Sequence, residues 1–390
     1  MIYVGIDVAS EKHDVCIMNG EGEIFKTIFT IRNCKTEYKK LLNTIKDAKK
    51  FWNDSKVSIG IESTGVYSAV LVNYLSEIED LDIIYINPIL TNMFQHSERV
   101  HYAKTDAIDA KGICMYLSNK NKRLLTYTKP SYHILEIKSL SRETKKIGKQ
   151  INKTANHLRG IIHTVFPEFF ECIHDICTDT AVEILIKYPT PDLLKKKRNF
   201  EDIKKNLKPG KRINLGPLIE LAKNSVGTFN DSDKIIITGL SKTLKMFIEQ
   251  KKNYVARLNT LACKYCKNLL TVPGIGSINA CAIIGEIGNI ENFHGYESII
   301  SYAGMNPIVY ESGKYKGNGL SISKKGSPYL RNAIIRSANL IVMKDDKFKE
   351  YFDKKISEGK PYKIAMGHVA KKLTRVIYQI LKNDTPYKMN

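Results

Sequence analysis

The sequence lacks the features that would place a protein in a membrane or outside the cell. Its longest uncharged apolar runs, such as ACAIIG at 280–285, are far shorter than the roughly 18 residues that a membrane-spanning helix needs. The chain starts directly with MIYVGID, which is typical of a strand and has no basic segment followed by a cleavable apolar core. We therefore expect a cytoplasmic protein with no membrane partner.

Cysteine is too scattered for a disulfide framework, since eight cysteines are spread over 390 residues. Only Cys263 and Cys266 form a C-x-x-C pair, and no second pair of Cys or His ligands follows at a spacing that suits structural zinc. The same spacing suits a helix with one buried face. We prefer this second interpretation.

Acidic residues are scarce relative to basic ones. Lysine and arginine number 61 against 40 aspartates and glutamates, which gives a formal net charge of +21 and a sequence pI near 9.4. An excess of this size favours a polyanionic partner, and nucleic acid fits better than a membrane surface.

Residues 1–128 have the pattern of an α/β domain. Three apolar, strand-like runs open the chain at 2–8, 14–18 and 24–31. Strands at 57–63 and 82–88 then alternate with helical intervals. This order predicts a mixed sheet flanked by helices.

Residues 129–267 are predicted to form a coiled-coil and helical assembly region. Two long segments repeat apolar residues at alternating steps of three and four, which is typical of a heptad seam. The first seam consists of Ile137, Leu140, Thr144, Ile147, Ile151, Thr154, Leu158, Ile161 and Val165. The second consists of Ile237, Leu240, Leu244, Phe247, Lys251, Tyr254, Leu258, Leu261 and Tyr265. The two helices could pair within one chain or between chains.

Residues 268–390 are predicted to form a mostly helical C-terminal domain. The domain opens with LLTVPGIGSINACAIIGEIG, which is typical of a helix-hairpin-helix-like segment. Gly274 and Gly276 would let the backbone turn tightly and direct N–H groups toward a phosphate at the start of the next helix. The alternative is a turn that only orients two packed helices, and we favour packing with some phosphate contact.

Four acids of the first region form a candidate metal site. In a helix that begins near Thr105, Asp106 and Asp109 lie one turn apart on one face, although aspartates there also suit a helix start. Asp7 interrupts an apolar strand and Glu62 ends another. A buried carboxylate needs a partner, and Mg²⁺ takes oxygen ligands while keeping waters for a phosphate substrate.

Two groups of short motifs mark the two ends of the chain. In the first region they are YVGIDVASEKHDV at 3–15, GIESTGVY at 60–67, INP at 86–88 and KTDAIDAK at 104–111. In the last region they are VPGIGSINACAIIGEIG at 272–288, SYAGMNP at 301–307, YESG at 310–313 and KKGSPYLRNAI at 324–334. With these motifs the sequence resembles the DEDD transposases of bacterial insertion sequences. The resemblance covers nearly the whole chain, and the middle region is its least diagnostic part.

This resemblance implies an α/β plus all-α protein whose N-terminal domain has a ribonuclease-H-like fold similar to that of the Holliday-junction resolvase RuvC. It implies that Asp7, Glu62, Asp106 and Asp109 bind Mg²⁺, which Mn²⁺ can replace. It also implies that Ser312 of YESG attacks a DNA phosphodiester and becomes linked to a 5′-phosphate. Without the resemblance, a serine beside a glycine in a polar loop is typical of a turn.

The resemblance also implies partners. Some members of the family resemble recombinases guided by a noncoding bridge RNA that pairs with both donor and target DNA. Because recombination must hold two duplexes, a homo-oligomer is expected, either a dimer or a tetramer. A bacterial protein of this kind would be associated with the nucleoid.

Lys324, Lys325 and Arg331 are candidate nucleic-acid contacts, since they belong to KKGSPYLR at 324–331, next to a basic and polar segment. A solvated basic face explains them equally well. Two other functions remain open at this point. One is a structure-selective endonuclease in which the acids use water and Ser312 is idle, and the other is a non-catalytic nucleic-acid-binding regulator.

Overall fold

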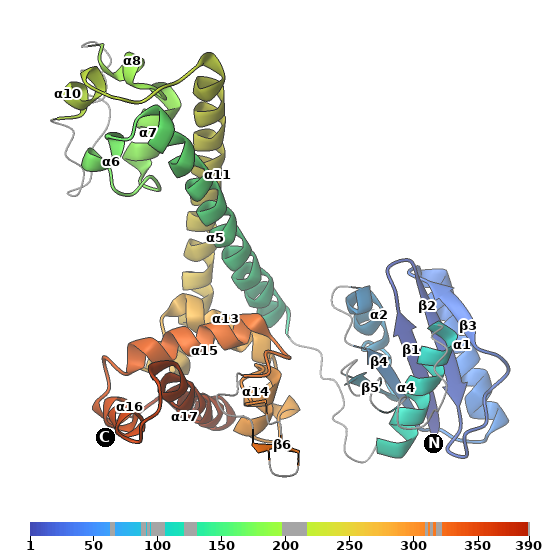
Figure 1. The fold of residues 1–390 in the computed structure, drawn as a ribbon. Helices are drawn as coiled ribbons and strands as arrows, with labels where there is room; N and C mark the ends of the chain where they lie inside the picture. The colour runs from blue at the N-terminus through green and yellow to red at the C-terminus, as the bar shows by residue number, and fades with distance from the viewer. Residues whose placement is uncertain are drawn as a thin grey trace. The chain divides into compact units, whose positions relative to one another are not determined.

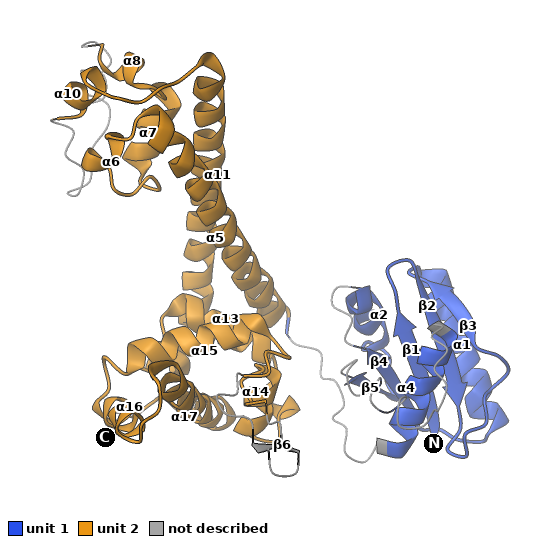
Figure 2. Cartoon of the chain, viewed as in Figure 1, with its two compact units in different colours: residues 1–131 blue, residues 132–390 orange. Residues whose placement is uncertain are grey.

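The structure is a computed structural model (Figure 1) that describes residues 1–62, 67–86, 91, 94, 106–120, 131–196, 217–308, 311–312, 315–316 and 322–388. It describes only the backbone of residues 106, 120, 311, 312, 315 and 316. The chain groups into two compact units, residues 1–131 and 132–390 (Figure 2). No helix in the described part of the chain is long and apolar enough to cross a membrane.

The first unit is a five-stranded mixed sheet covered by helices on both faces. Its elements are β1 (Ile2–Val8), β2 (Lys12–Met18), β3 (Phe29–Arg32), α1 (Lys35–Phe51), β4 (Val57–Glu62), α2 (Tyr67–Leu75), β5 (Leu81–Ile86) and α4 (Asp106–Lys120). The strand order is β3-β2-β1-β4-β5. β1, β2 and β3 are antiparallel, whereas β4 pairs in parallel with both β1 and β5. This is the ribonuclease-H-like arrangement that was expected.

Alternation along the strands divides this unit into two layers of core. Ile2, Val4 and Ile6 of β1 pack with β4, α1 and α2 on one face. Tyr3 and Gly5 point to the other face, which α4 covers. The antiparallel meander was predicted correctly, but its third strand is shorter than expected, because Ile24 makes only an isolated bridge to Met18 and β3 begins at Phe29.

The second unit is built on two long helices with a group of shorter helices at each end (Figure 1). Its elements are α5 (Tyr132–Val165), α6 (Phe169–Cys172), α7 (Asp179–Lys187), α8 (Pro191–Leu194), α10 (Leu218–Lys223), α11 (Asp231–Tyr265), α12 (Lys267–Leu270), α13 (Ser277–Ile287), η2 (Ile290–Asn292), α14 (Tyr296–Tyr302), β6 (Glu311–Ser312), β7 (Tyr315–Lys316), α15 (Pro328–Ile341), α16 (Asp346–Ser357) and α17 (Tyr362–Asn383). The boundary predicted near residue 267 falls between α11 and α12, inside this unit.

Helices α5 and α11 pack along one another within the chain. α11 begins at a capping box, in which Asn230 accepts from the N–H of Asp233 and the Asp233 carboxylate accepts from the N–H of Asn230. The predicted seam of α5 is buried at Ile137, Thr144, Ile147, Ile151, Leu158 and Val165, and Leu140 is half-buried. Ala155 and Ile162 are buried where Thr154 and Ile161 were expected. A straight helix drifts by about 20° per heptad, which turns these neighbouring positions toward the core.

The second unit has two separate apolar cores. One joins the second half of α5 and the start of α11 to α6, α7, α8 and α10, and Phe169 lies fully buried within it. The other joins the opposite ends of both long helices to α12 through α17. This other core includes Met305 and Leu330, which lie before and after Ser312 in the chain.

Candidate active site

Two glycines on neighbouring strands allow α4 to lie directly on the sheet. Gly5 of β1 and Gly60 of β4 are partners in the parallel register. A Cβ atom on Gly5 would stand 2.2 Å from the backbone oxygen of Ala110, and one on Gly60 would stand 2.7 Å from Leu117. Since carbon atoms cannot approach backbone oxygen this closely, only glycine fits at position 5.

The contact between α4 and the sheet is buried and hydrogen-bonded. The Cys114 thiol of α4 donates to the carbonyl oxygens of Cys16, at 3.1 Å, and of Tyr3, at 3.5 Å. Burial raises the pKa of the Cys114 thiol well above its usual value, so the thiol keeps the proton that it donates. Ala110 lies over Gly5, and Ile113, Tyr116 and Leu117, which come later in α4, share one apolar cluster with Tyr3, so α4 runs opposite to β1.

This geometry brings the predicted acids to one edge of the sheet. Asp7 and Glu62 follow the paired residues Ile6 and Ile61, and alternation places them on the same face as the two glycines. The first turn of α4, with Asp106 and Asp109, precedes Ala110 and therefore lies at the Asp7 end of β1. As predicted, α4 begins beside Thr105, at Asp106.

The described acids have unequal hydrogen bonding. Glu62 accepts a hydrogen bond from the buried Thr91 hydroxyl. The Oδ1 atom of Asp109 is buried and has no hydrogen-bond partner among the described atoms. A buried carboxylate oxygen without a donor suits a cation as its partner. The donor set, all carboxylate oxygen, is the one that Mg²⁺ and Mn²⁺ prefer.

Three of the four predicted ligands have described side chains. Among the described side chains, no three Asp, Glu, His or Cys residues converge closely enough to hold a metal ion. The side chain of Asp106, the fourth predicted ligand, lies outside the described atoms.

A fifth acid on this face was missed by the sequence reasoning. Asp14 of β2 is paired with Asp7 in the antiparallel register, so the two side chains lie on the same face. Asp14 is 8% exposed and accepts a hydrogen bond from the Thr30 hydroxyl. The sequence contained a signal for this position, because an antiparallel pairing of IYVGIDV with DVCIM places Asp14 opposite Asp7.

Ser312 lies in a short hairpin of the second unit. β6 pairs antiparallel with β7, and Ser312 is the partner of Tyr315. The side chain of Ser312 and the neighbouring Gly313 lie outside the described atoms. The structure therefore gives the backbone position of the predicted nucleophile within its own unit.

The two candidate glycines of the PGIG turn differ from one another. Gly274 has a φ of +89°, and a Cβ atom there would stand 2.8 Å from the amide nitrogen of Ile341, so packing against α15 accounts for it. Gly276 precedes α13, has ordinary φ and has open space around it. With Asn279 and Arg336 it lines an open hollow of about 530 Å³, where a phosphate contact stays a prediction.

The three basic residues predicted to contact nucleic acid differ in exposure and hydrogen bonding. Lys324 and Lys325 are exposed, as a nucleic-acid contact requires. Arg331 instead donates from Nη1 to the carbonyl oxygens of Ala303, at 2.8 Å, and Lys324, at 3.4 Å. These bonds give Arg331 a part in the local structure, and its phosphate contact stays a prediction.

Comparison with known families agrees with both halves of this description. A model of IS110-type DEDD transposases, described as a transposase, matches residues 4–167. A second, described as a transposase of the IS116/IS110/IS902 family, matches residues 266–353. Together they cover more than half of the chain, in the predicted order. The chain belongs to this family of insertion-sequence transposases.

Relatives of the transposase are distant but extensive. A 43.6 kDa protein of insertion element IS110 from Streptomyces coelicolor is 24% identical over 73% of this chain and 72% of its own length. A pilin gene-inverting protein from Moraxella lacunata is 21% identical over 99% of this chain and 97% of its own. A complex of T. thermophilus RuvC with a Holliday junction is 9% identical over 33% of this chain and 99% of its own, with a TM-score of 0.25. The two family models, rather than this distant fold likeness, make the transposase an enzyme of DNA recombination.

The Gly5 contact can be tested in the whole transposase. Gly5→Ala should destabilise the first unit by about 3 kcal/mol, because the clashing atom belongs to the backbone and α4 must move away. Trp52, the only tryptophan, lies in this unit, so its fluorescence during urea unfolding reports the change. Gly20→Ala is the control, because its nearest neighbour is 4.0 Å away. Equal stability of the two variants would show that α4 does not need the glycine.

Proposed function

We propose that this transposase cleaves and rejoins DNA through a covalent link between Ser312 and a 5′-phosphate, at a site completed by Mg²⁺. The observation that carries the proposal is the meeting of Asp7 and Glu62 on adjacent strands with the first turn of α4, where Asp109 keeps a buried oxygen without a hydrogen-bond donor. Asp7, Glu62, Asp106 and Asp109 would hold the cation, and Mn²⁺ can replace Mg²⁺.

Each group has a chemical part in this proposal. When bound, the cation lowers the energy of negative charge that develops on the phosphate oxygens. The acids hold that charge in place and can accept a proton from the nucleophile. Asp14, held by Thr30, adds negative charge beside Asp7 and so favours occupation by a cation.

The covalent step is a displacement at phosphorus. The Ser312 hydroxyl oxygen forms a bond to phosphorus, the bond from phosphorus to the 3′ oxygen breaks, and the serine proton passes to an acid of the site. The departing strand ends in a 3′-hydroxyl once its oxygen takes up a proton. Because a phosphodiester is kept in the link to serine, a second 3′-hydroxyl can reverse the reaction and join a new strand.

The partners follow from the family and from the charge. The transposase acts on donor and target DNA, and we propose that a noncoding RNA from the flank of its element selects both. A net charge of +21 suits a protein that binds the phosphate backbones of DNA and RNA together. We further propose that two or four copies assemble, so that two duplexes are held at once.

The nucleophile can be tested by substitution. Ser312→Ala should abolish the covalent protein–DNA adduct formed on DNA carrying the ends of the element, because no other group at this position can attack phosphorus. Ser323→Ala, in the same segment, is the matched control and should leave the adduct intact. Adducts are measured on denaturing gels with labelled DNA. Strand cleavage that persists in Ser312→Ala would point to hydrolysis by water instead.

The metal site can be tested without DNA. Addition of Mg²⁺ at 100 times its dissociation constant should stabilise the first unit by about 2.7 kcal/mol, measured from the thermal shift in Trp52 fluorescence. Asp109→Asn should remove most of this shift, because the amide cannot replace the charged oxygen. Asp47→Asn, an exposed acid on α1, should keep it. A full shift in Asp109→Asn would remove Asp109 from the ligand set.

The guide can be tested by sequencing. RNA that copurifies with the transposase should be one discrete species that maps to the DNA flanking its gene, and RNase treatment should stop adduct formation. A heterogeneous mixture of RNA, together with full activity after RNase treatment, would contradict RNA guidance and leave the recombinase proposal standing.

A further inference from the structure

A buried glutamate in the second unit lies under the segment that carries Ser312. Glu286 of α13 has a side chain that is only 2% exposed. It lies in the motif VPGIGSINACAIIGEIG, and the proposed chemistry does not use it. Because burying a carboxylate costs free energy, a buried glutamate outside the catalytic site requires a physical explanation.

Residues 305–323 include Ser312, and the two ends of this segment lie together at one base. At that base the N–H of Lys324 donates to the carbonyl of Gly304 at 3.0 Å, and the N–H of Ser323 donates to that of Asn306 at 2.8 Å. A further bridge joins Pro307 to Ile322. The two ends of the segment are therefore held together as a short antiparallel pair.

Glycine makes this close approach possible. Gly304 has a φ of +65°, and a Cβ atom on it would stand 2.9 Å from the backbone of Lys324. Gly326 has a φ of +148°, and a Cβ atom on it would stand 2.2 Å from the carbonyl oxygen of Tyr302. The base is thus a specified packing arrangement of backbone on backbone.

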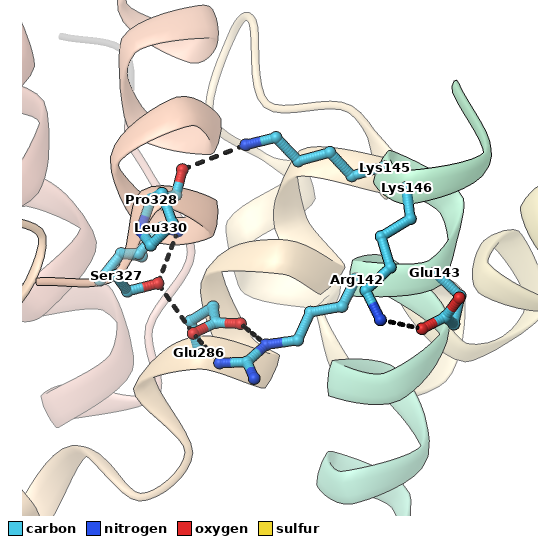
Figure 3. A network of polar contacts seen from close by, with 8 residues as sticks. All are labelled: Arg142, Glu143, Lys145, Lys146, Glu286, Ser327, Pro328 and Leu330. Carbon is cyan, nitrogen blue, oxygen red and sulfur yellow. Dashed lines mark hydrogen bonds and ion pairs between the residues drawn. The ribbon is translucent and has the colours of Figure 1, made fainter. Parts of the chain in front are cut away.

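Glu286 contacts Ser327, at the start of α15 (Figure 3). Its Oε2 atom accepts a hydrogen bond from the Ser327 hydroxyl at 2.9 Å. The guanidinium of Arg142, on α5, donates to both carboxylate oxygens, at 2.6 Å from Nε and 2.9 Å from Nη2. Such a two-point pair fixes direction as well as distance.

Electrostatics keep this carboxylate ionised. Burial opposes the charge, but the hydrogen bonds and positive charge of Arg142, the charge of Lys138 and the Ser327 hydroxyl outweigh it, so the pKa of Glu286 lies below its usual value. Burial lowers the pKa of the neighbouring Lys138, against the attraction of Glu286. Three donated hydrogen bonds thus use both oxygens of a charged group.

Ser327 connects the carboxylate to the base. Its N–H donates to the carbonyl of Tyr302 at 2.7 Å, and Tyr302 comes two residues before Gly304 in the chain. Its hydroxyl also accepts the N–H of Leu330 at 3.2 Å and so caps α15. One residue therefore links Glu286, the start of α15 and the base of the segment.

Helix α5 holds the same turn of α15 from the side. The ring of Tyr329 lies under the guanidinium of Arg142, at 5.0 Å, and under the Lys145 ammonium, at 5.1 Å. Lys145 also donates to the carbonyl of Pro328 at 3.1 Å (Figure 3). The long helix is thereby fastened to the residues that follow the segment.

We propose that Glu286 is a positioning residue which, through Ser327 and Arg142, fixes the base of segment 305–323 on helix α5 and so sets where Ser312 lies for attack on DNA. This inference rests on the proposed role of Ser312. A buried ion pair adds little net stability compared with apolar packing, so its contribution is the fixed direction that it imposes.

The test compares four single variants of the full-length chain. Glu286→Gln keeps the shape but offers one acceptor oxygen to three donors, so the network cannot be satisfied. Ser327→Ala removes the hydroxyl and Ser327→Thr keeps it. Glu143→Gln is the matched control, because Glu143 lies beside Arg142 and makes an exposed pair with Lys146 at 2.6 Å (Figure 3).

Two readouts are expected to change together. At saturating DNA, the rate constant for adduct formation should fall about a hundredfold in Glu286→Gln and Ser327→Ala, as expected for a displaced nucleophile, with DNA affinity kept. Ser327→Thr should restore it and Glu143→Gln should match the wild type. Hydrogen exchange without DNA should speed up at the amides of Ser323, Lys324 and Ser327 in the two impaired variants.

Each contrary result has its own meaning. Exchange in Glu286→Gln equal to that in Glu143→Gln would overturn the inference, and so would faster exchange with an unchanged rate constant for the adduct. If Glu286→Gln does not fold, the Ser327→Ala and Ser327→Thr pair decides by the same readouts. An adduct that survives Ser312→Ala would overturn the proposed function itself, a result that the exchange measurement keeps separate.

Discussion

The contact of α4 with two glycines of the sheet is the constraint on which the acidic site depends. With any side chain at Gly5, α4 would have to rise from the sheet, because the backbone oxygen of Ala110 occupies that space. The first turn of α4 would then move away from Asp7 and Glu62. The metal proposal therefore depends on an apolar packing detail as much as on the acids. Glycine at two paired positions allows the short distance between α4 and the strands β1 and β4.

Much of the first unit follows from alternation and register alone. From the sequence, Asp7 could be placed inside the first strand and Glu62 at the end of another, and α4 begins at the predicted acid. The function of Gly5 could not be predicted, because it depends on a helix about 100 residues later in the chain. Asp14 was not predicted as part of the site, because it stands at the start of the apolar run DVCIM and only the pairing with β1 brings it beside Asp7. Long-range contacts of this kind carry no local signal.

The second unit shows where periodicity becomes inaccurate. The heptad pattern identified both long helices, yet it placed Lys251 and Tyr254 in a seam where Lys251 is exposed and Tyr254 only half-buried. Arg331 donates to two backbone carbonyls, a role that its sequence position did not indicate, and its contact with nucleic acid stays a prediction. Glu286 had no prediction at all. A charged residue inside an apolar motif is a signal, but its partner Arg142 lies on another helix, and only the tertiary structure pairs them.

The proposed metal ligands lie in the first unit and the proposed nucleophile, Ser312, lies in the second. The most direct test is to digest the covalent protein–DNA complex and identify by mass spectrometry the peptide that carries the nucleotide. The account predicts a nucleotide joined by its 5′-phosphate to Ser312, with formation of the complex dependent on Mg²⁺ and on Asp109. A nucleotide on another residue, or strand cleavage that leaves no nucleotide on the protein, would contradict it.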